Sequence, residues 1–259
     1  MNIVVCVKQT VDTAATISVE QGTVSWGDTP LVLNPWDEFA VEEGLRLREA
    51  HGGKVTALTV GPESATEALR SALAMGADAA VRVDDSSLEG ADSLVVSAVL
   101  AAALEKMGDV DLALFGREAV DSNSGVLQAQ VARRLGWASL PLVAAITAID
   151  GDGRAIEVER MLGEGRQRVK ATLPAALSVV KEINEPRYAS FMGIRKASRV
   201  DVPVWTSAEL SMDQVDPGVS WLAPEAAADV EVACEFIDVD DVGEAAHALV
   251  QRLREEKVL

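Results

Sequence analysis

A loop of small polar residues carries the clearest chemistry in this sequence. It reads Gly116-Arg117-Glu118-Ala119-Val120-Asp121-Ser122-Asn123-Ser124-Gly125. The loop joins an apolar run to a segment with helical spacing, so backbone N–H groups and side-chain hydroxyls are expected to gather at a helix start. Such a helix start is a natural site for phosphate. Ordinary capping of that helix by residues 121–124 is the simpler interpretation of the loop taken alone, with the phosphate site as the alternative.

Conventional enzyme chemistry has little support in the sequence. His51 and His247 are the only histidines, which makes a histidine-based metal site or a Ser-His-acid triad hard to build. There is no G-x-x-x-x-G-K-[ST] loop, and no G-x-G-x-x-G follows a strand pattern. Asp12, Asp37 and Asp121 could meet at one end of a sheet, but loop and helix capping explains each of them more simply. We therefore assign no catalytic residue and expect no metal site, while these residues leave the question of an enzyme open.

A second segment, residues 183–197, concentrates cations and large apolar side chains in an acidic chain. Pro186 fixes its own φ and keeps Glu185 extended, so the chain is expected to turn outward there. An apolar anchor ringed by Arg and Lys has the composition of a protein-protein hot spot, although a buried helix start with solvated charges would give the same letters. The residues expected to dock a partner are Arg187, Tyr188, Phe191, Met192, Ile194, Arg195 and Lys196.

Composition and charge narrow the function classes. The formal net charge of -18 argues against nucleic-acid binding, which needs a basic face. The longest apolar stretches, such as residues 94–104, fall short of the roughly 20 residues that span a bilayer. No signal-peptide pattern follows Asn2, and the distant Cys6 and Cys234 indicate neither a disulfide framework nor a metal cluster. We expect a cytoplasmic protein without membrane insertion.

Strand and helix patterns alternate through the first half of the chain. Strands are predicted at residues 3–7, 55–60, 79–83 and 110–115, and helices at 36–50, 64–75, 91–107 and 125–135. Continuous β-branched runs are typical of strands buried on both faces of a parallel sheet. The strict alternation predicts a doubly wound α/β domain with a mostly parallel, Rossmann-like sheet.

The second half predicts a β-rich extension of the same domain, partly antiparallel, and an arm. Short strand patterns at residues 144–149, 156–161, 168–173 and 176–180 are separated by turns around 150–153 and 163–165. A small hairpin is predicted at residues 16–26, outside the main sheet. Acidic residues gather between Glu225 and Glu244, where a solvated flexible arm with a final helix is the simpler interpretation.

The predicted sheet also indicates where a ligand would bind. In an open α/β sheet, ligands bind beyond the carboxyl ends of the strands, near the point where strand order reverses. The loops predicted to lie there are residues 8–13, 34–37, 60–62 and 116–127.

Four ordered motifs resemble those of the beta subunit of electron transfer flavoproteins. They are N-P-W-D-E-F-A-V-E-E-G-L-R-L at residues 34–47, G-P with L-R-S-A-L-A-M-G-A-D at 61–62 and 69–78, L-P-A-A-L-S-V-V at 173–180, and N-E-P-R-Y at 184–188 followed by K-A at 196–197. The similarity runs from about residue 1 to about residue 210. It implies an α/β domain of the adenine-nucleotide-binding type over residues 1–210, with a partner-recognition loop at 183–199. Residues 211–259 would form a C-terminal arm and helix that contacts an alpha subunit.

The resemblance further implies that the loop at 116–127 cradles the phosphate of AMP. The implied cofactor-binding residues are Cys6, Asn34, Pro35, Trp36, Asp37, Val60, Gly116, Ala119, Asp121, Asn123, Ser124, Gly125, Val126 and Leu127. The family commonly has Gln before the matching Ala and a Gln-x-Gly after the acidic stretch, whereas this chain has Glu118, Val126 and Gln128. Side-chain contacts to a phosphate would therefore be fewer here, and backbone contacts from residues 123–127 would remain.

In this family the redox FAD is held mainly by the alpha subunit and is shared at the interface. The implied partners are the alpha subunit, an acyl-CoA dehydrogenase of fatty acid beta-oxidation or a related dehydrogenase, and a membrane quinone oxidoreductase as acceptor. Some members carry a second FAD in place of AMP and bifurcate electrons, and residues 7–13 (V-K-Q-T-V-D-T) resemble their V-K-Q-V-P-D-T start. A stand-alone nucleotide-binding protein of the universal-stress type is the remaining alternative, although such a protein has no reason to carry residues 172–199 or the arm.

Overall fold

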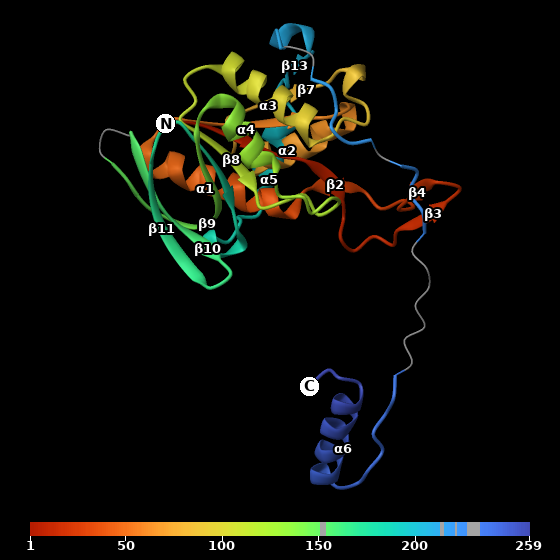
Figure 1. Ribbon diagram of the computed structural model, residues 1–259. Helices are drawn as coiled ribbons and strands as arrows, with labels where there is room; N and C mark the ends of the chain where they lie inside the picture. The colour runs from red at the N-terminus through yellow and green to blue at the C-terminus, as the bar shows by residue number, and fades with distance from the viewer. Residues whose placement is uncertain (151–153, 213–214, 221, 227–233) are drawn as a thin grey trace. The chain divides into compact units, whose positions relative to one another are not determined.

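The centre of the fold is a parallel sheet of β-branched and small apolar residues. Its inner strands are β1 (Asn2–Cys6), β6 (Lys54–Val60), β7 (Ala79–Val83), β8 (Leu112–Gly116) and β12 (Ala175–Val179). They lie in the order β12-β8-β1-β6-β7, and every neighbouring pair is parallel. Figure 1 shows this sheet in the computed structural model, which describes residues 1–150, 154–212, 215–220, 222–226 and 234–259.

Helices cover both faces of the sheet. They are α1 (Pro35–His51), α2 (Thr66–Met75), α3 (Ser93–Met107) and α4 (Leu127–Leu135), and the short helix α5 (Phe191–Ala197) packs on α2. Because side chains of a strand alternate between faces, Ile3 and Val5 join the core cluster under α1 and α2, while Val4 and Cys6 join the cluster under α3 and α4. The doubly wound α/β fold is confirmed, and the elements of the first half begin and end within two residues of their predicted positions.

An antiparallel extension continues the sheet beyond β12. It consists of β9 (Ala138–Ile149), β10 (Ala155–Leu162) and β11 (Gly165–Thr172), with β9 parallel to β12 and antiparallel to β10. The prediction of a strand at 144–149 was too short, because β9 begins at Ala138. Pro141 interrupts the strand pattern at that start in the sequence. Beside it the register between β9 and β12 shifts, and the hydroxyl of Ser178 accepts the N–H of Leu142 at 3.0 Å. The turn predicted at 150–153 lies mostly outside the described residues.

The helix predicted from residue 125 begins at Leu127, and this difference changes the interpretation of the loop before it. Val126 occupies the N-cap position and makes no side-chain cap hydrogen bond. Asn123 and Gly125 have φ of 49° and 61°, a left-handed backbone that cannot continue a helix. The simpler interpretation, capping of this helix by residues 121–124, is therefore wrong.

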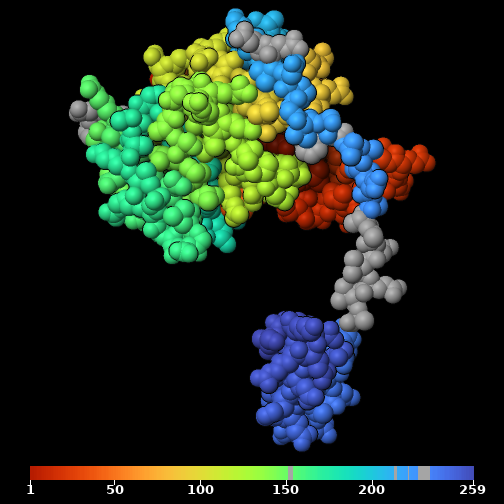
Figure 2. Space-filling model, viewed as in Figure 1, coloured from red at the N-terminus to blue at the C-terminus, as the bar shows by residue number. Residues whose placement is uncertain are grey.

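Smaller elements complete the first part of the chain. The predicted hairpin is confirmed as β3 (Ser18–Glu20) and β4 (Thr23–Ser25), a separate two-stranded sheet. In Figure 2 it lies at the opposite end of this part of the chain from the hairpin of β10 and β11. The remaining elements are β2 (Gln9–Val11), β5 (Leu31–Leu33), β13 (Val204–Trp205) and the 3₁₀ turns η1 (Glu63–Ala65), η2 (Ser86–Leu88), η3 (Lys181–Ile183) and η4 (Ala208–Leu210).

The chain divides into two compact units, Met1–Ala223 and Pro224–Leu259. The second unit contains α6 (Val242–Glu255), the predicted final helix, none of whose residues is buried. Part of the predicted acidic arm, residues 227–233, lies outside the described residues. Within the described part of the chain, every helix is too short or too polar to cross a membrane.

Candidate functional site

A cavity of about 640 Å³ lies at the carboxyl ends of β1 and β6. Three of the four loops predicted to hold a ligand meet there, namely those that follow β1, β6 and β8. Its lining residues are Lys8, Gln9, Thr10, Val11, Asp12, Thr13, Ala15, Ile17, Val24, Trp26, Leu31, Val60, Gly61, Pro62, Ser64, Ala65, Val120 and Asp121. The cavity lies where strand order reverses on either side of β1, the expected place for a ligand in such a sheet.

The fourth predicted loop, residues 34–37, lies beneath the cavity loops and holds them together. The Asn34 amide donates to the carbonyl of Glu118 at 2.9 Å and accepts the N–H of Val120 at 3.2 Å. The Asp37 carboxylate accepts the N–H groups of Lys8 at 2.8 Å and Gly116 at 3.2 Å. Both side chains are buried, so in this structure they position the loops after β1 and β8.

Burial sets the protonation of two groups beneath the cavity. Desolvation raises the pKa of Asp37 to about 7, although the hydrogen bonds from Lys8, Asn34 and Gly116 oppose the rise. Burial, and to a lesser degree the Asp37 carboxylate, raises the pKa of the Cys6 thiol well above its ordinary value. The thiol is therefore protonated at neutral pH and contributes only bulk to the floor of the site.

One ion pair joins opposite walls of the cavity. The Lys8 ammonium lies 2.8 Å and 2.7 Å from the two carboxylate oxygens of Asp121. Among the described residues that line the cavity, Lys8 is the only cation, whereas Asp12 and Asp121 are anionic there. A phosphate that entered this cavity would therefore find a single side-chain cation, already paired with a carboxylate.

The structure brings some predicted cofactor residues to the cavity and leaves others away from its wall. Val60 and Asp121 line it. Cys6, Asn34 and Asp37 are buried. The Trp36 ring lies 5.4 Å from the Arg117 guanidinium, and Ala119 accepts the N–H of Asn123 at 2.8 Å within its own loop. The remaining predicted residues that are not part of the lining are Pro35, Gly116, Ser124, Gly125, Val126 and Leu127.

The three aspartates that could have clustered are divided. Asp12 and Asp121 line the cavity, whereas Asp37 lies beneath it. Asp12 also accepts the N–H of Ala14 at 2.9 Å, which agrees with its interpretation as a loop-capping residue.

Several lining residues were missed from the sequence. Ile17, Val24 and Trp26 come from the hairpin β3-β4 and its flanks, and Leu31 comes from β5. The sequence carried a signal for the hairpin itself, but none for its packing beside the ends of β1 and β6. That placement depends on contacts between segments far apart in the chain.

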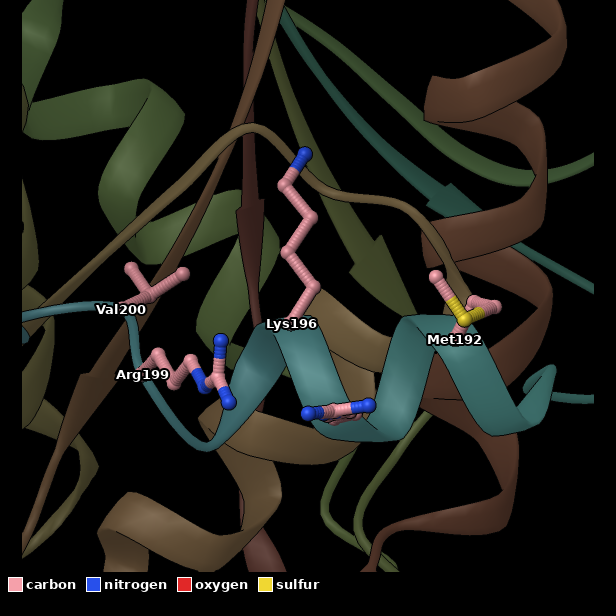
Figure 3. A pocket seen from close by; sticks show the side chains of 5 residues that line it. Met192, Lys196, Arg199 and Val200 are labelled. Atoms are coloured by element: carbon pink, nitrogen blue, oxygen red, sulfur yellow. The ribbon is translucent and has the colours of Figure 1, made fainter.

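The segment predicted to dock a partner is exposed. Tyr188 is 99% exposed, Phe191 93% and Met192 75%, and Ile194 is also exposed. Ser190 caps α5 by accepting the N–H of Gly193 at 3.0 Å. Along the same helix a hollow of about 400 Å³ is lined by Met192, Arg195, Lys196, Arg199 and Val200 (Figure 3). Met192 thus shares one open surface with Arg195, Lys196 and Arg199, an apolar side chain beside cations as expected for a hot spot.

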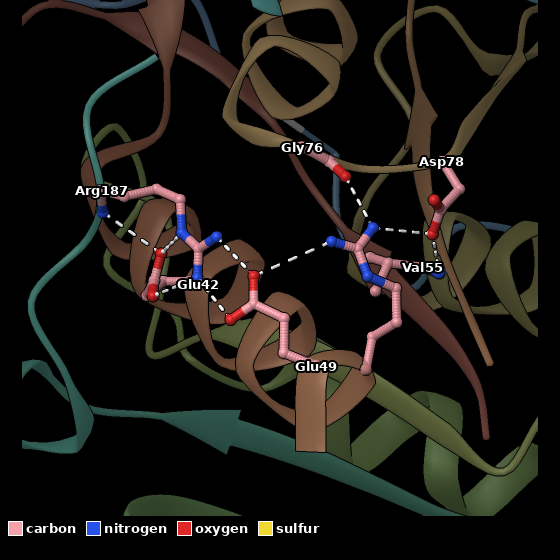
Figure 4. A network of polar contacts seen from close by, with 7 residues as sticks. Glu42, Glu49, Val55, Gly76, Asp78 and Arg187 are labelled. Carbon is pink, nitrogen blue, oxygen red and sulfur yellow. Dashed lines mark hydrogen bonds and ion pairs between the residues drawn. The ribbon is translucent and has the colours of Figure 1, made fainter. Parts of the chain in front are cut away.

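Arg187 differs from the rest of the predicted docking set. Its guanidinium bonds to two carboxylates of α1, those of Glu42 and Glu49, as Figure 4 shows. The hydrogen bonds that Arg187 donates, those to Glu49 first and then those to Glu42, raise its pKa further above its already high ordinary value. In this structure Arg187 contacts its own chain through every nitrogen of the guanidinium group.

Comparison with known proteins agrees with the fold and the loops. Residues 23–210 match the family model for the electron transfer flavoprotein domain. The electron transfer flavoprotein subunit beta of Clostridium acetobutylicum is 35% identical over 261 residues, which cover 99% of each chain. Protein FixA of Azorhizobium caulinodans is 36% identical over 220 residues, 83% of this chain and 78% of FixA.

A third relative comes from a different redox assembly. The caffeyl-CoA reductase-Etf complex subunit CarD of Acetobacterium woodii is 33% identical over 265 residues and covers all of both chains. Together with the match of the family model to most of the domain, these relatives confirm the resemblance drawn from the four motifs. The chain belongs to the electron transfer flavoprotein family and is similar to its beta subunits.

Proposed function

We propose that this chain binds AMP in the cavity at the ends of β1 and β6 and pairs with an alpha subunit whose FAD it helps to cradle. The pair would carry electrons from an acyl-CoA or related dehydrogenase to a membrane quinone oxidoreductase, in the cytoplasm. The observation that supports this function best is the cavity itself, because it unites the loops that follow β1, β6 and β8. FAD, when bound at the subunit interface, would supply the redox chemistry, and this chain would supply binding and orientation.

The residues of the cavity fit an adenine nucleotide. Ile17, Val24, Trp26, Leu31 and Val60 provide apolar walls for a flat base, and the volume lies within the range of small-molecule sites. Thr10 also belongs to the lining, and its buried hydroxyl has no hydrogen-bond partner among the described residues. Buried polar groups are normally satisfied, so this hydroxyl supports the proposal of a polar ligand.

Lys8 is the residue best placed to meet the phosphate. Its pair with Asp121 is about half exposed, and exposed pairs of this kind contribute only ~0–1 kcal/mol. A phosphate carries more negative charge than the Asp121 carboxylate. It would therefore replace that carboxylate as the partner of the Lys8 ammonium with a gain in interaction energy. We expect the remaining contacts from the backbone N–H groups of residues 124–127, which belong to the same loop as Asp121 but lie outside the lining; the N–H of Asn123 is already donated to the carbonyl of Ala119.

A second FAD in place of AMP is the other candidate. The sequence of residues 7–13 and the presence of CarD among the relatives favour it. Thr10 and Val11 stand where the bifurcating pattern has Val and Pro, which weighs in favour of AMP. The same cavity would hold the adenosine part of either ligand.

Nucleotide analysis of the purified heterodimer separates these functions. The nucleotides would be released by acid and identified by chromatography and absorbance. One FAD and one AMP per heterodimer would support the proposed carrier, whereas two FAD molecules would support bifurcation. If the chain forms no stable pair with an alpha subunit and no FAD is present, a stand-alone nucleotide-binding protein becomes the better interpretation.

A further inference from the structure

We propose that Arg187 is a positioning residue that clamps the exposed segment 188–194 to α1 and so sets where this segment meets a redox partner. The existence of that partner rests on the proposed function. The clamp itself rests on contacts within this chain, and it assigns Arg187 a different task from the exposed residues that follow it.

The geometry of the clamp is that of a guanidinium held between two carboxylates. Arg187 donates from Nε to Glu42 Oε2 at 2.7 Å and from Nη2 to Glu42 Oε1 at 3.0 Å. It donates from Nη1 and Nη2 to the two oxygens of Glu49, at 2.6 Å and 3.1 Å. The backbone N–H of Arg187 also donates to Glu42, at 3.2 Å. Bidentate pairs of this kind fix the orientation of the planar group as well as its position.

The two carboxylates contribute differently. Glu42 and Glu49 lie two turns apart on the same face of α1. The Glu42 side chain is 7% exposed, whereas that of Glu49 is 50% exposed. A buried carboxylate needs a charged or hydrogen-bonding partner, so loss of Arg187 would cost Glu42 more than it costs the solvated Glu49.

The clamp continues into the body of the domain. Glu49 lies 4.0 Å from Arg48, whose guanidinium donates to the carbonyl of Gly76 at 2.8 Å and pairs with Asp78 at 3.0 Å. Asp78 in turn accepts the N–H of Val55 at 2.8 Å. Figure 4 shows this chain of contacts from Arg187 to the end of α2 and the start of β6. The clamp is therefore anchored to rigid elements.

Residues 188–190, which join Arg187 to α5, are exposed and gain little from packing. Tyr188 is almost fully exposed, and α5 has seven residues, fewer than a helix needs to be stable alone in water. α5 is held by close packing on α2, where a Cβ added at Gly193 would collide with the carbonyl oxygen of Ala74. On the other side of Arg187, Asn184 donates to Glu43 at 3.0 Å. Arg187 lies between these two attachments, and its contact with α1 fixes the direction in which the chain continues to α5.

Direct docking by Arg187 is the competing interpretation. A partner carboxylate would have to displace Glu42 or Glu49, and displacement of Glu42 would leave a buried charge without its partner. The exposed cations Arg195, Lys196 and Arg199 are available at no such cost.

The test compares Arg187→Gln with wild type in the heterodimer with the alpha subunit. Amide hydrogen exchange should become at least about tenfold faster over residues 187–197. The KM of the partner dehydrogenase for the heterodimer should rise about tenfold, with kcat and flavin content retained, because the docking surface remains intact but loses its fixed position. Arg187→Lys keeps the charge but loses the bidentate geometry, and should give an intermediate KM.

Two control variants separate the clamp from loss of charge. Arg195→Gln removes a cation from α5 without touching α1, so it should leave the exchange rates over residues 187–197 unchanged. Arg70→Gln removes an exposed cation of α2, whose one ion pair within the described residues is with Glu67, and should leave both exchange and KM unchanged. If Arg187→Gln does not fold, Glu49→Gln removes the exposed half of the clamp and should show the same changes at smaller size.

Unchanged exchange in Arg187→Gln, or in Glu49→Gln where that variant replaces it, would overturn the clamp. Faster exchange with an unchanged KM would overturn the positioning role. If the wild-type heterodimer accepts electrons from no dehydrogenase, the proposed function fails, and the exchange experiment still decides whether Arg187 holds the segment.

Discussion

At the scale of single residues, Asp37 joins two loops while it is itself buried. Its carboxylate accepts one N–H from the loop after β1 and one from the end of β8. Desolvation of that carboxylate raises its pKa to about 7. The group that organises the site therefore also couples the stability of the folded protein to pH.

The Asp37→Asn variant tests this coupling. The ordinary pKa of Asp is about 3.9 in the unfolded chain, so between about pH 4 and about pH 7 the folded chain binds more protons than the unfolded chain. Asp37 should therefore lower the free energy of unfolding as pH rises through this window, by on the order of 4 kcal/mol in total. Asp37→Asn should lack this slope in denaturant titrations, whereas Asp28→Asn, a change at an exposed position, should retain it. The same slope in Asp37→Asn and wild type would contradict the raised pKa.

Lys8 offers a second test at this scale, directed at the ligand. Lys8→Gln should weaken the binding of AMP to nucleotide-stripped heterodimer about tenfold, because it removes the only side-chain cation of the lining. Asp121→Asn should not weaken binding, since it releases Lys8 for the phosphate. Titration calorimetry measures both, with Lys54→Gln, at the opposite end of β6, as the control. Full affinity in Lys8→Gln would show that the phosphate lies elsewhere.

At the scale of elements, α5 presents apolar side chains that the fold leaves uncovered. Phe191 and Met192 lie in its first turn, and Ser190 caps it. Large exposed apolar residues next to cations are enriched where proteins meet, so this helix is the element on which partner choice is expected to depend.

The anchor role of Phe191 can be tested directly. Phe191→Ala should slow reduction of the heterodimer by its partner dehydrogenase about tenfold or more, because a hot-spot aromatic is lost, while flavin content stays intact. Leu162→Ala removes an exposed apolar side chain at the end of β10 and should leave the rate unchanged. Equal rates for Phe191→Ala and wild type would refute the anchor role.

At the scale of the whole molecule, the two units differ in what stabilises them. Both hydrophobic core clusters lie within Met1–Ala223. The second unit buries no residue of α6, and the apolar residues Val242, Leu249 and Val250 of that helix are exposed. A helix of this kind gains its stability mostly from a surface against which it packs, which supports the prediction that it contacts the alpha subunit.

Removal of residues 224–259 tests that prediction. The shortened chain should unfold at the same temperature as the full chain to within about 2 °C, because its core is complete. Its affinity for the alpha subunit should fall at least about tenfold, as measured by titration of the tagged alpha subunit. A large loss of thermal stability, or unchanged affinity, would show that the second unit has another role.

The sequence by itself determined the α/β class, most element boundaries in the first half and the family. Alternating β-branched and helical patterns, such as those of β1 and α1, are local properties that survive in any environment, and the four motifs are carried by consecutive residues. Patterns of this kind also predicted four ligand loops, three of which line the cavity, because parallel strands place their carboxyl ends at one edge of a sheet.

Only the tertiary structure decided which side chains meet. The start of β9 depends on parallel pairing with β12, the start of α4 on two left-handed residues, and the outer wall of the cavity on a hairpin from another part of the chain. In the sequence, Arg187 is one of several cations in the predicted docking segment. Its different role depends on contacts with Glu42 and Glu49, which are far away along the chain. Contacts between distant segments follow from the packing of helices on the sheet, and no local pattern of residue types records them.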